Sequence, residues 1–303
     1  MSSQADRVRD AFGMIDAGRS PQGAEIKIGL VGRGIAASLT PIMHETEGRR
    51  LGLAYRYDLI DFDSLGLEDS DLEAVLHWAQ ANGYDGLNVT FPFKQAIIPY
   101  LATLAPEAAA IGAVNTVVLR GGGRNGHNTD CWGFAQSVRS GLGDVALGRV
   151  VQIGAGGAGA AVAHALVQLG AEQIEIVDAD LRKAEALAQR VTDMTGIKAR
   201  PWPTYALEEV LPGADGVVNA TPVGMEKLPG FPVAPQLLNA TQWVADIIYF
   251  PRQTEFLRQA RAMGCAVLPG GGMAINQAVR AFALFTDLEP DGDEMGKTFT
   301  TYA

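Results

Sequence analysis

Apolar residues along this chain fall into short runs, separated by stretches in which they recur every three or four positions. The first strand-like run is 26–31, and further runs follow at 86–90, 150–153, 173–177, 216–219, 243–246 and 265–268. Helical spacing is clear over 273–286, where Ile275, Val279, Phe282 and Phe285 form one stripe. Strands that alternate with helices predict an α/β fold built on largely parallel sheets.

Turn and cap residues place several of these elements. Thr40 followed by Pro41 indicates a helix start and predicts a helix over about 41–52. The segment from Ser70 to Glu73 has the form of a capping box, for a helix that ends at about 82–83. We also expect a helix from about Pro92, a hairpin with strands at 113–119 and 124–128, and a helix from Thr129.

The most specific pattern begins past the middle of the chain. An apolar strand enters the turn Gly154, Ala155, Gly156, Gly157, Ala158, Gly159, and an alanine-rich helix leaves it. The next strand ends on Asp178, 19 positions after the last loop glycine (178 − 159 = 19). This order is the fingerprint of a dinucleotide-binding fold, in which the glycines permit a tight turn and close approach of the pyrophosphate. Asp178 suits a ribose diol and repels an added phosphate, unless it is a plain surface-turn acid, whereas Asp180 is more typical of a helix cap.

These patterns together predict two α/β domains. Residues 25–128 form the expected substrate-binding domain, to which 269–303 return, and 129–268 form a Rossmann-type dinucleotide-binding domain. A cleft between two such domains is the usual ligand site. Residues 1–24 are polar and short of apolar spacing, so we expect a flexible or weakly helical extension without a functional role.

Composition narrows the class of protein. The chain has 303 residues, of which 48% are hydrophobic and 19% charged, as in ordinary soluble proteins of two domains. Its formal net charge of −10 argues against nucleic acid or an anionic membrane as a partner. No apolar run approaches the ~20 residues that span a bilayer. Two cysteines, Cys131 and Cys265, and no signal-peptide pattern favour a reducing cytoplasm.

Three segments carry groups suited to chemistry. Lys94 lies in the first turn of a predicted helix, where the macrodipole disfavours a cation, and this favours a functional lysine over a merely solvated one. Asp130 at a helix start is by itself a typical capping residue, and its interest depends on pairing with Lys94 as a proton carrier. Ser38 and Thr40 precede a helix and could bind a carboxylate, with Thr40 as a simple cap the alternative.

Other catalytic classes find little support. The four histidines lack metal-ligand spacing, and the sequence contains neither a Gly-x-Ser-x-Gly elbow nor paired cysteine ligands. A metal-dependent or nucleophilic hydrolase is therefore not expected.

Taken together, the motifs resemble the shikimate/quinate dehydrogenase family from residue 26 to about 290. The segments that carry the resemblance are Gly29–Gly32, Ser38–Pro41, Asn88–Lys94, Gly112–Thr116, Gly126–Asp130, Gly154–Gly159, Asn219–Met225, Asp246–Tyr249 with Pro251, and Gly272–Gln277. The resemblance implies that Lys94 and Asp130 are the catalytic pair. It implies that the substrate is surrounded by Ser38, Thr40, Asn88, Thr90, Asn115, Tyr249 and Gln277, the first two near its carboxylate. It places Thr221, Gly270 and Met273 with the glycine loop on the cofactor side.

Two departures from the family pattern bear on specificity. Biosynthetic members typically have Ser-x-Ser before the proline, whereas this chain has Thr40, as in the quinate/shikimate branch. Members that use NADP commonly place Asn-Arg-Thr after the second strand, whereas this chain has Asp178-Ala179-Asp180 and lacks that arginine. The resemblance therefore implies NAD in preference to NADP, and no metal.

The expected activity is NAD-dependent oxidation of quinate or shikimate to 3-dehydroquinate or 3-dehydroshikimate, in the shikimate pathway or in quinate metabolism. An aminoshikimate or aminoquinate dehydrogenase of the same family is an alternative. A ligand-sensing homologue without turnover and a folate-linked dehydrogenase of similar plan are weaker ones. The sequence leaves monomer and homodimer equally open.

Overall fold

A computed structural model describes residues 3–16 and 26–303 of the chain. The chain divides into two compact units, each of α/β class, and each is described by itself. The first unit ends at Thr129 and takes in Ala278–Ala303 again, while the second is Asp130–Gln277. The last long helix, α11 (Gly271–Thr286), therefore contributes to both units, and the division falls within it and not at residue 268.

The first unit is built on a mixed six-stranded sheet with the order β2-β1-β3-β5-β6-β4. Its strands are β1 (Ile26–Gly32), β2 (Tyr55–Asp61), β3 (Gly86–Val89), β4 (Thr103–Leu104), β5 (Thr116–Val118) and β6 (Asn125–His127). Strands β2, β1 and β3 are parallel, as expected, but β5 is antiparallel to both β3 and β6. The expectation of a largely parallel sheet is thus wrong for this half of the unit. The predicted hairpin is present, and the strands of a hairpin must be antiparallel.

Helices and short 3₁₀ turns cover this sheet. They are α1 (Gln4–Asp16), α2 (Thr40–Arg50), α3 (Leu72–Ala81), α4 (Phe93–Ala96), α5 (Pro106–Ile111), α12 (Gly292–Tyr302), η1 (Asp69–Asp71), η2 (Ile98–Tyr100) and η3 (Arg120–Gly122). The predicted helices α2 and α3 are confirmed, but their starts differ from expectation. Thr40 is the first residue of α2 and not its cap, since Leu39 occupies the cap position without a side-chain cap. The Thr40 amide donates a 3.3 Å hydrogen bond to the Ser38 hydroxyl. The capping box joins Glu68 to Asp71 and lies two residues before the predicted Ser70–Glu73.

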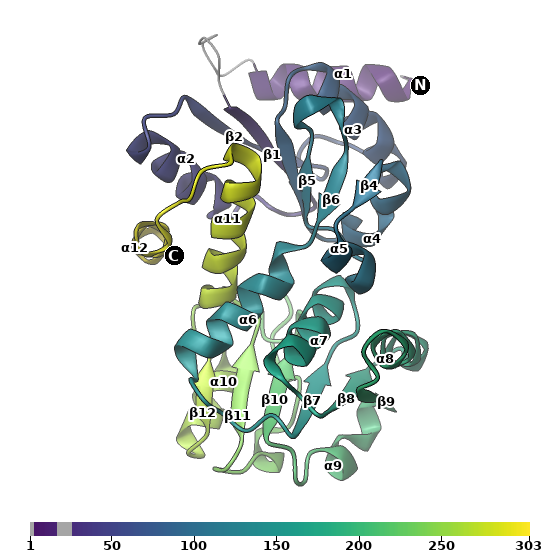
Figure 1. The fold of residues 1–303 in the computed structure, drawn as a ribbon, viewed down its shortest axis with the longest axis vertical. Coiled ribbons are helices and arrows are strands. Elements are labelled where there is room, and N and C mark those ends of the chain that lie inside the picture. Colours follow the sequence, from purple (N-terminus) through teal and green to yellow (C-terminus); the bar gives the residue numbers. More distant parts are fainter. Residues whose placement is uncertain (1–2, 17–25) are drawn as a thin grey trace. The chain divides into compact units, whose positions relative to one another are not determined.

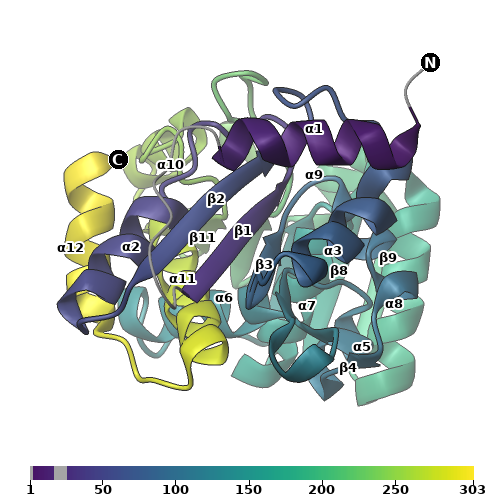
Figure 2. The same cartoon turned by 90° about the horizontal axis from the view of Figure 1, so that it is seen from above.

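Helix α1 packs on α3 within the first unit (Figure 2). Phe12 is fully buried and stacks on Trp78 with ring centroids 3.7 Å apart. Arg7 forms an ion pair with the buried carboxylate of Asp71 at 2.6 Å. Part of the extension set aside in the sequence therefore belongs to the hydrophobic core of this unit. The remainder of the predicted extension 1–24, residues 1–2 and 17–24, lies outside the described residues.

The second unit contains six parallel strands in the order β12-β11-β10-β7-β8-β9 (Figure 1). The strands are β7 (Arg149–Ile153), β8 (Gln173–Asp178), β9 (Lys198–Pro203), β10 (Gly216–Asn219), β11 (Trp243–Asp246) and β12 (Ala266–Leu268). The helices and turns are α6 (Thr129–Gly141), α7 (Gly157–Leu169), α8 (Leu181–Thr195), α9 (Leu207–Val210), α10 (Glu255–Ala262), η4 (Thr204–Ala206) and η5 (Pro235–Leu237). Counted from β7, the strand order is 3-2-1-4-5-6, which is the doubly wound Rossmann arrangement.

None of the helices in the described ranges is both long and apolar enough to cross a lipid bilayer.

Candidate active site and dinucleotide site

The glycines of the loop between β7 and α7 differ in whether the local structure requires them. Gly154 has φ +106°, which side chains rarely adopt, and a Cβ at Gly159 would lie 2.2 Å from the Gly154 carbonyl oxygen. Gly156 differs from both, because its φ of −77° is ordinary and a Cβ there would meet nothing within 4 Å. The fold itself does not require glycine at 156. The open space there, at a helix N-terminus without a side-chain cap, fits the phosphates of a dinucleotide.

Asp178 lies at the end of β8 and is joined to this loop. One carboxylate oxygen accepts a 2.7 Å hydrogen bond from the amide of Ala155, and the other accepts a 2.8 Å bond from the amide of Asp180. Asp180 is the N-cap of α8, as expected, and its carboxylate also pairs with the exposed Arg182 guanidinium at 3.1 Å. The predicted ribose-binding acid is therefore held at the mouth of the glycine loop, and the nearby Arg182 is already paired.

Three more predicted residues of the second unit, Thr221, Tyr249 and Gly270, follow the carboxyl ends of its parallel strands. Thr221 follows β10 and donates its hydroxyl hydrogen to Asn219 Oδ1 at 2.7 Å. Tyr249 follows β11, and Gly270 follows β12. A Cβ at Gly270 would lie 2.3 Å from the carbonyl oxygen of Ile247, so glycine is required where this turn meets the segment leading to Tyr249. In doubly wound folds, ligands bind outside the carboxyl ends of the parallel strands.

A buried carboxylate joins two of these strand ends. Asp246, at the end of β11, accepts hydrogen bonds from Asn219 Nδ2 at 3.0 Å, from the Ile248 amide at 3.0 Å and from the Thr254 hydroxyl at 2.8 Å. Its burial raises the pKa of the Asp246 carboxyl to about 6, against the partial opposition of these hydrogen bonds. Asp246 thus fixes the segments that carry Thr221 and Tyr249, without being one of the predicted site residues.

In the first unit, two predicted amides are held by a common network. Asn88 on β3 accepts a hydrogen bond from the Tyr57 hydroxyl at 2.7 Å and donates to Thr116 Oγ1 at 3.0 Å. Asn115 accepts from the Thr129 amide at 2.8 Å and donates to the Thr129 hydroxyl at 2.9 Å. The hydroxyl of Thr116 in turn donates to Asn115 at 3.0 Å, which closes the network.

The predicted hydroxyl-bearing residues of the first unit, Ser38, Thr40 and Thr90, follow the carboxyl ends of β1 and β3. Ser38 and Thr40 follow β1, and their hydroxyl oxygens are 3.2 Å apart. Asp61 at the end of β2 sets the path of this loop, because it accepts hydrogen bonds from the amides of Gly34 and Ile35 at 2.9 and 3.0 Å. Thr90 follows β3. A Cβ at Gly32 would lie only 2.4 Å from the Thr90 methyl group, so glycine at 32 leaves room for this side chain.

Lys94 lies on the short helix α4 in the first unit, and Asp130 is the first residue of the second. Asp130 is buried, and its negative charge is one of two influences on Tyr249, whose pKa is raised first by removal from water and then by this charge. Gln277 and the buried Met273 lie on α11 and complete the predicted set. Asp130, Tyr249, Met273 and Gln277 all belong to the second unit.

Several residues that hold the site were not predicted from the sequence. Tyr57, Asp61 and Thr129 bind predicted residues or their loops in the first unit, while Gln152 and Asp246 do so in the second. The motifs Gly126–Asp130 and Asp246–Tyr249 contain two of them, and Gln152 is a polar residue in an otherwise apolar strand. Tyr57 and Asp61 gave no signal, since β2 was not recognised as a strand.

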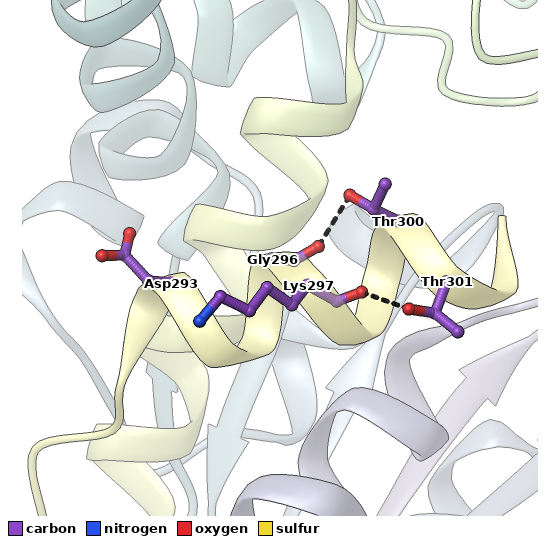
Figure 3. A pocket seen from close by; sticks show the side chains of 5 residues that line it. All are labelled: Asp293, Gly296, Lys297, Thr300 and Thr301. Atoms are coloured by element: carbon purple, nitrogen blue, oxygen red, sulfur yellow. Dashed lines mark hydrogen bonds between the residues drawn. The ribbon is translucent and has the colours of Figure 1, made fainter.

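A surface hollow lies apart from the predicted site residues. This hollow, of about 570 Å³, opens over α12 and is lined by Asp293, Gly296, Lys297, Thr300 and Thr301 (Figure 3). The hydroxyls of Thr300 and Thr301 bond carbonyl oxygens of the same helix at 2.8 Å, so they are used within α12. In residues 3–16 and 26–303, no three or more His, Cys, Asp or Glu side chains are grouped so that they could hold a metal ion.

Known proteins resemble this chain over most of its length. Residues 30–117 match the model of the shikimate dehydrogenase substrate-binding domain, and residues 150–224 match that of the saccharopine dehydrogenase NADP-binding domain. A shikimate dehydrogenase (NADP(+)) from Streptomyces avermitilis is 52% identical over 88% of this chain and 92% of its own length. A quinate/shikimate dehydrogenase (NAD(+)) from Corynebacterium efficiens is 46% identical over 90% of this chain and 97% of its own length. The solved structure of quinate dehydrogenase from Corynebacterium glutamicum in complex with NAD is similar, with a TM-score of 0.86, 44% identity, and coverage of 91% and 99% of the two chains.

Proposed function

Because the chain belongs to the shikimate/quinate dehydrogenase family, we propose that it is an NAD-dependent oxidoreductase acting on quinate, shikimate or both. The reaction interconverts the ring hydroxyl of the cyclic polyol carboxylate and the corresponding ketone, 3-dehydroquinate or 3-dehydroshikimate. The bound nicotinamide supplies the hydride chemistry, and the protein supplies alignment and proton transfer. We place this activity in the cytoplasm.

The backbone network between Lys94 and Thr129 carries the assignment of the proton-transfer pair. The carbonyl oxygen of Lys94 accepts a 2.7 Å hydrogen bond from the amide of Val114. The next residue, Asn115, binds both the amide and the hydroxyl of Thr129, which directly precedes Asp130. This arrangement supports a role in which Lys94 accepts the proton of the substrate hydroxyl and Asp130 hydrogen-bonds nearby.

The preference for NAD rests on two acids, Asp178 at the end of β8 and Asp180 just after it. Each oxygen of the Asp178 carboxylate already accepts one backbone hydrogen bond and has capacity for another, which suits the hydroxyls of a ribose. A 2′-phosphate at the same place would be repelled by Asp178, and the Arg182 guanidinium that could offset this repulsion is paired with Asp180. Quinate/shikimate dehydrogenases (NAD(+)) at 44–46% identity agree with this preference.

An NADP-dependent shikimate dehydrogenase is the second candidate. It is favoured by the relatives from Streptomyces avermitilis and Arthrobacter, which are named as NADP(+) enzymes and are 52% and 48% identical to this chain. The two candidates differ in the cofactor that they use, so the cofactor must be tested directly. An aminated polyol acid remains the alternative substrate, since the predicted side chains bind a carboxylate and shared hydroxyls.

One panel of assays separates these candidates. Reduction of NAD and of NADP is measured with quinate, with shikimate and with an aminated analogue. We expect a higher kcat/KM with NAD, and turnover of quinate or shikimate ahead of the amine. A higher kcat/KM with NADP would overturn the role given to Asp178. Absence of turnover with every pair would favour the ligand-sensing alternative.

Two variants then test the acids themselves. Asp178→Ala should lower kcat/KM with NAD and reduce the ratio of kcat/KM for NAD to that for NADP. It removes the acceptor for the ribose hydroxyls and the repulsion of a 2′-phosphate together. Asp180→Ala should raise kcat/KM for NADP by releasing Arg182. The matched control is Asp193→Ala, which removes an exposed acid from the same helix and should leave the ratio unchanged.

A further inference from the structure

A buried amide lies beneath the glycine loop. Gln152 is on β7, two residues before Gly154, and its side chain is 0% exposed. Its Nε2 lies 2.8 Å from the carbonyl oxygen of Gly154 and 2.8 Å from that of Gly159. Both partners can only accept, so the atom between them must be the amide nitrogen, and both of its hydrogens are used.

These two bonds join the first and the last glycine of the loop. The backbones of Gly154 and Gly159 approach so closely that a Cβ at Gly159 would lie 2.2 Å from Gly154 O and 3.1 Å from Gln152 Nε2. The carbonyl dipoles of the two glycines therefore point at one donor group. The loop amides between them, which would face the ligand phosphates, have their path fixed at both ends.

The arrangement has a cost that the core alone would not require. Gln152 Oε1 is buried and is one of the side-chain atoms in the described ranges without a hydrogen-bond partner. A buried unpaired acceptor is destabilising, and the neighbouring core positions on this strand are filled by Val150 and Val151. An aliphatic side chain at 152 would avoid the cost but would leave the two carbonyls without this donor.

We propose that Gln152 is a positioning residue for the dinucleotide: it acts through the backbone of the glycine loop, holding it in the conformation that accepts the pyrophosphate. The inference rests on the proposed function in one respect, namely that the cofactor binds at this loop. Gln152 itself is beneath the loop and touches neither substrate nor the reacting atoms.

The test compares NAD binding with stability in two variants of Gln152. Gln152→Met keeps the length of the side chain and removes the donor, and Gln152→Glu keeps its shape but turns an acceptor toward the two carbonyls. We expect the Kd for NAD, measured by isothermal titration calorimetry without substrate, to rise on the order of tenfold in Gln152→Met and further in Gln152→Glu. The melting temperature of the ligand-free Gln152→Met should change little, because the lost bonds are offset by removal of the unpaired oxygen. At saturating NAD the KM for quinate or shikimate should be unchanged.

Val151→Ala is the matched control on the same strand. It opens a cavity at a fully buried position and should lower the melting temperature while leaving the Kd for NAD near that of the wild type. A merely structural role would give Gln152→Met this same pattern, with lowered stability and unchanged Kd, and would overturn the proposal.

A substitution in the loop itself separates this inference from the proposed cofactor site. Gly156→Val places a side chain in the open space over the loop without a conformational penalty, since its φ is −77°. Abolished NAD binding in Gly156→Val supports the site, and an unchanged Kd in that variant would overturn both proposals. If Gly156→Val abolishes binding while Gln152→Met binds as the wild type does, the site stands and the positioning role of Gln152 is overturned.

Discussion

Asn88 and Asn115 show how the protein sets the polarity of two predicted substrate contacts. Asn88 uses both amide hydrogens, toward Asn115 O and Thr116 Oγ1, so only its oxygen can take a further partner. The Asn115 oxygen accepts from the Thr129 amide and the Thr116 hydroxyl, and one Asn115 amide hydrogen is donated to the Thr129 hydroxyl. One amide hydrogen of Asn115 is left for a further partner. If both contact the substrate, Asn88 accepts from a hydroxyl and Asn115 donates to an oxygen.

Tyr57 fixes the orientation of Asn88, and its hydroxyl can be removed with little change in shape. Tyr57→Phe should raise the KM for the polyol acid about 3–10-fold with a smaller change in kcat, because Asn88 loses the donor that orients its oxygen. Steady-state kinetics at saturating NAD check this. Tyr55→Phe is the control, since the Tyr55 hydroxyl lies 2.9 Å from His44 Nδ1 and not at Asn88. Equal effects of the two substitutions would contradict the role given to Tyr57.

Lys94 is the residue at which proton transfer is tested. Lys94→Met should lower kcat by a factor of about 10²–10⁴ with a smaller effect on KM, as is typical for loss of a general base. The exposed Lys198→Met, which removes a cation from β9, is the control and should retain full activity. A kcat near that of the wild type in Lys94→Met would remove the lysine from the mechanism.

At the scale of elements, sequence patterns predicted what local chemistry specifies. The β7–α7–β8 unit was predicted because its apolar runs, its glycine-rich turn and the acid at the end of β8 follow one another in the order that the dinucleotide-binding fold requires. Strand β2 was missed because Arg56, Asp58 and Asp61 are buried in it, and their charges interrupt the apolar pattern. The ion pair between Arg56 and Asp58, 2.8 Å long, replaces an apolar contact that periodicity could have revealed.

Other elements escaped prediction because their stability is tertiary. Strand β9 carries Pro201 and Pro203, which argue against a strand, and it is tolerated because β9 is the edge of its sheet. Helix α1 buries only Val8, Ala11 and Phe12, a stripe too short to distinguish from chance in a polar extension. Its place depends on Trp78 and Asp71, some sixty residues away in the chain. The residues that hold the site escaped for the same reason, since hydrogen bonds such as Tyr57 to Asn88 have no local signature.

The docking of α1 gives a prediction about stability. Phe12→Ala should lower the free energy of unfolding by about 3–5 kcal/mol, because it leaves a cavity against Trp78 in the core of the first unit. Met14→Ala on the same helix removes a side chain that is 58% exposed and should change stability by less than about 0.5 kcal/mol. Urea unfolding of both variants measures the difference. Similar small losses in the two would show that α1 contributes little to the core.

At the scale of the whole molecule, each unit places its predicted site residues at the carboxyl ends of its parallel strands. In the first, Ser38, Thr90 and Asn88 gather where β1 and β3 end, and in the second the loop glycines and Asp178 follow β7 and β8. In a parallel sheet, the loops that follow the strands all lie at the carboxyl ends of the strands. Residues distant in sequence can therefore lie close together there. Holding these loops in place requires polar groups to be buried, and this burial is destabilising.

Asp246 is the clearest case of such burial, and it predicts a pH dependence of the stability of the protein. Its pKa of about 6 in the folded protein exceeds the ordinary 3.8, so between these values the folded state binds more protons than the unfolded chain. The stabilising contribution is complete below pH 4 and is lost as the pH rises through 6. The difference amounts to about 3 kcal/mol, from 1.36 kcal/mol for each pKa unit.

Asp246→Asn should remove this dependence while keeping the fold. The Asn oxygen can accept from Asn219 and the Ile248 amide as before, and its NH₂ group can donate to the Thr254 hydroxyl, which then accepts instead of donating. We expect the wild type to lose stability relative to the variant between pH 4 and 8, by up to about 3 kcal/mol in urea unfolding. Titration of all other groups is common to both proteins and cancels in the difference. Parallel stability curves over this range would mean that Asp246 is ionised throughout, with its three hydrogen bonds outweighing its burial.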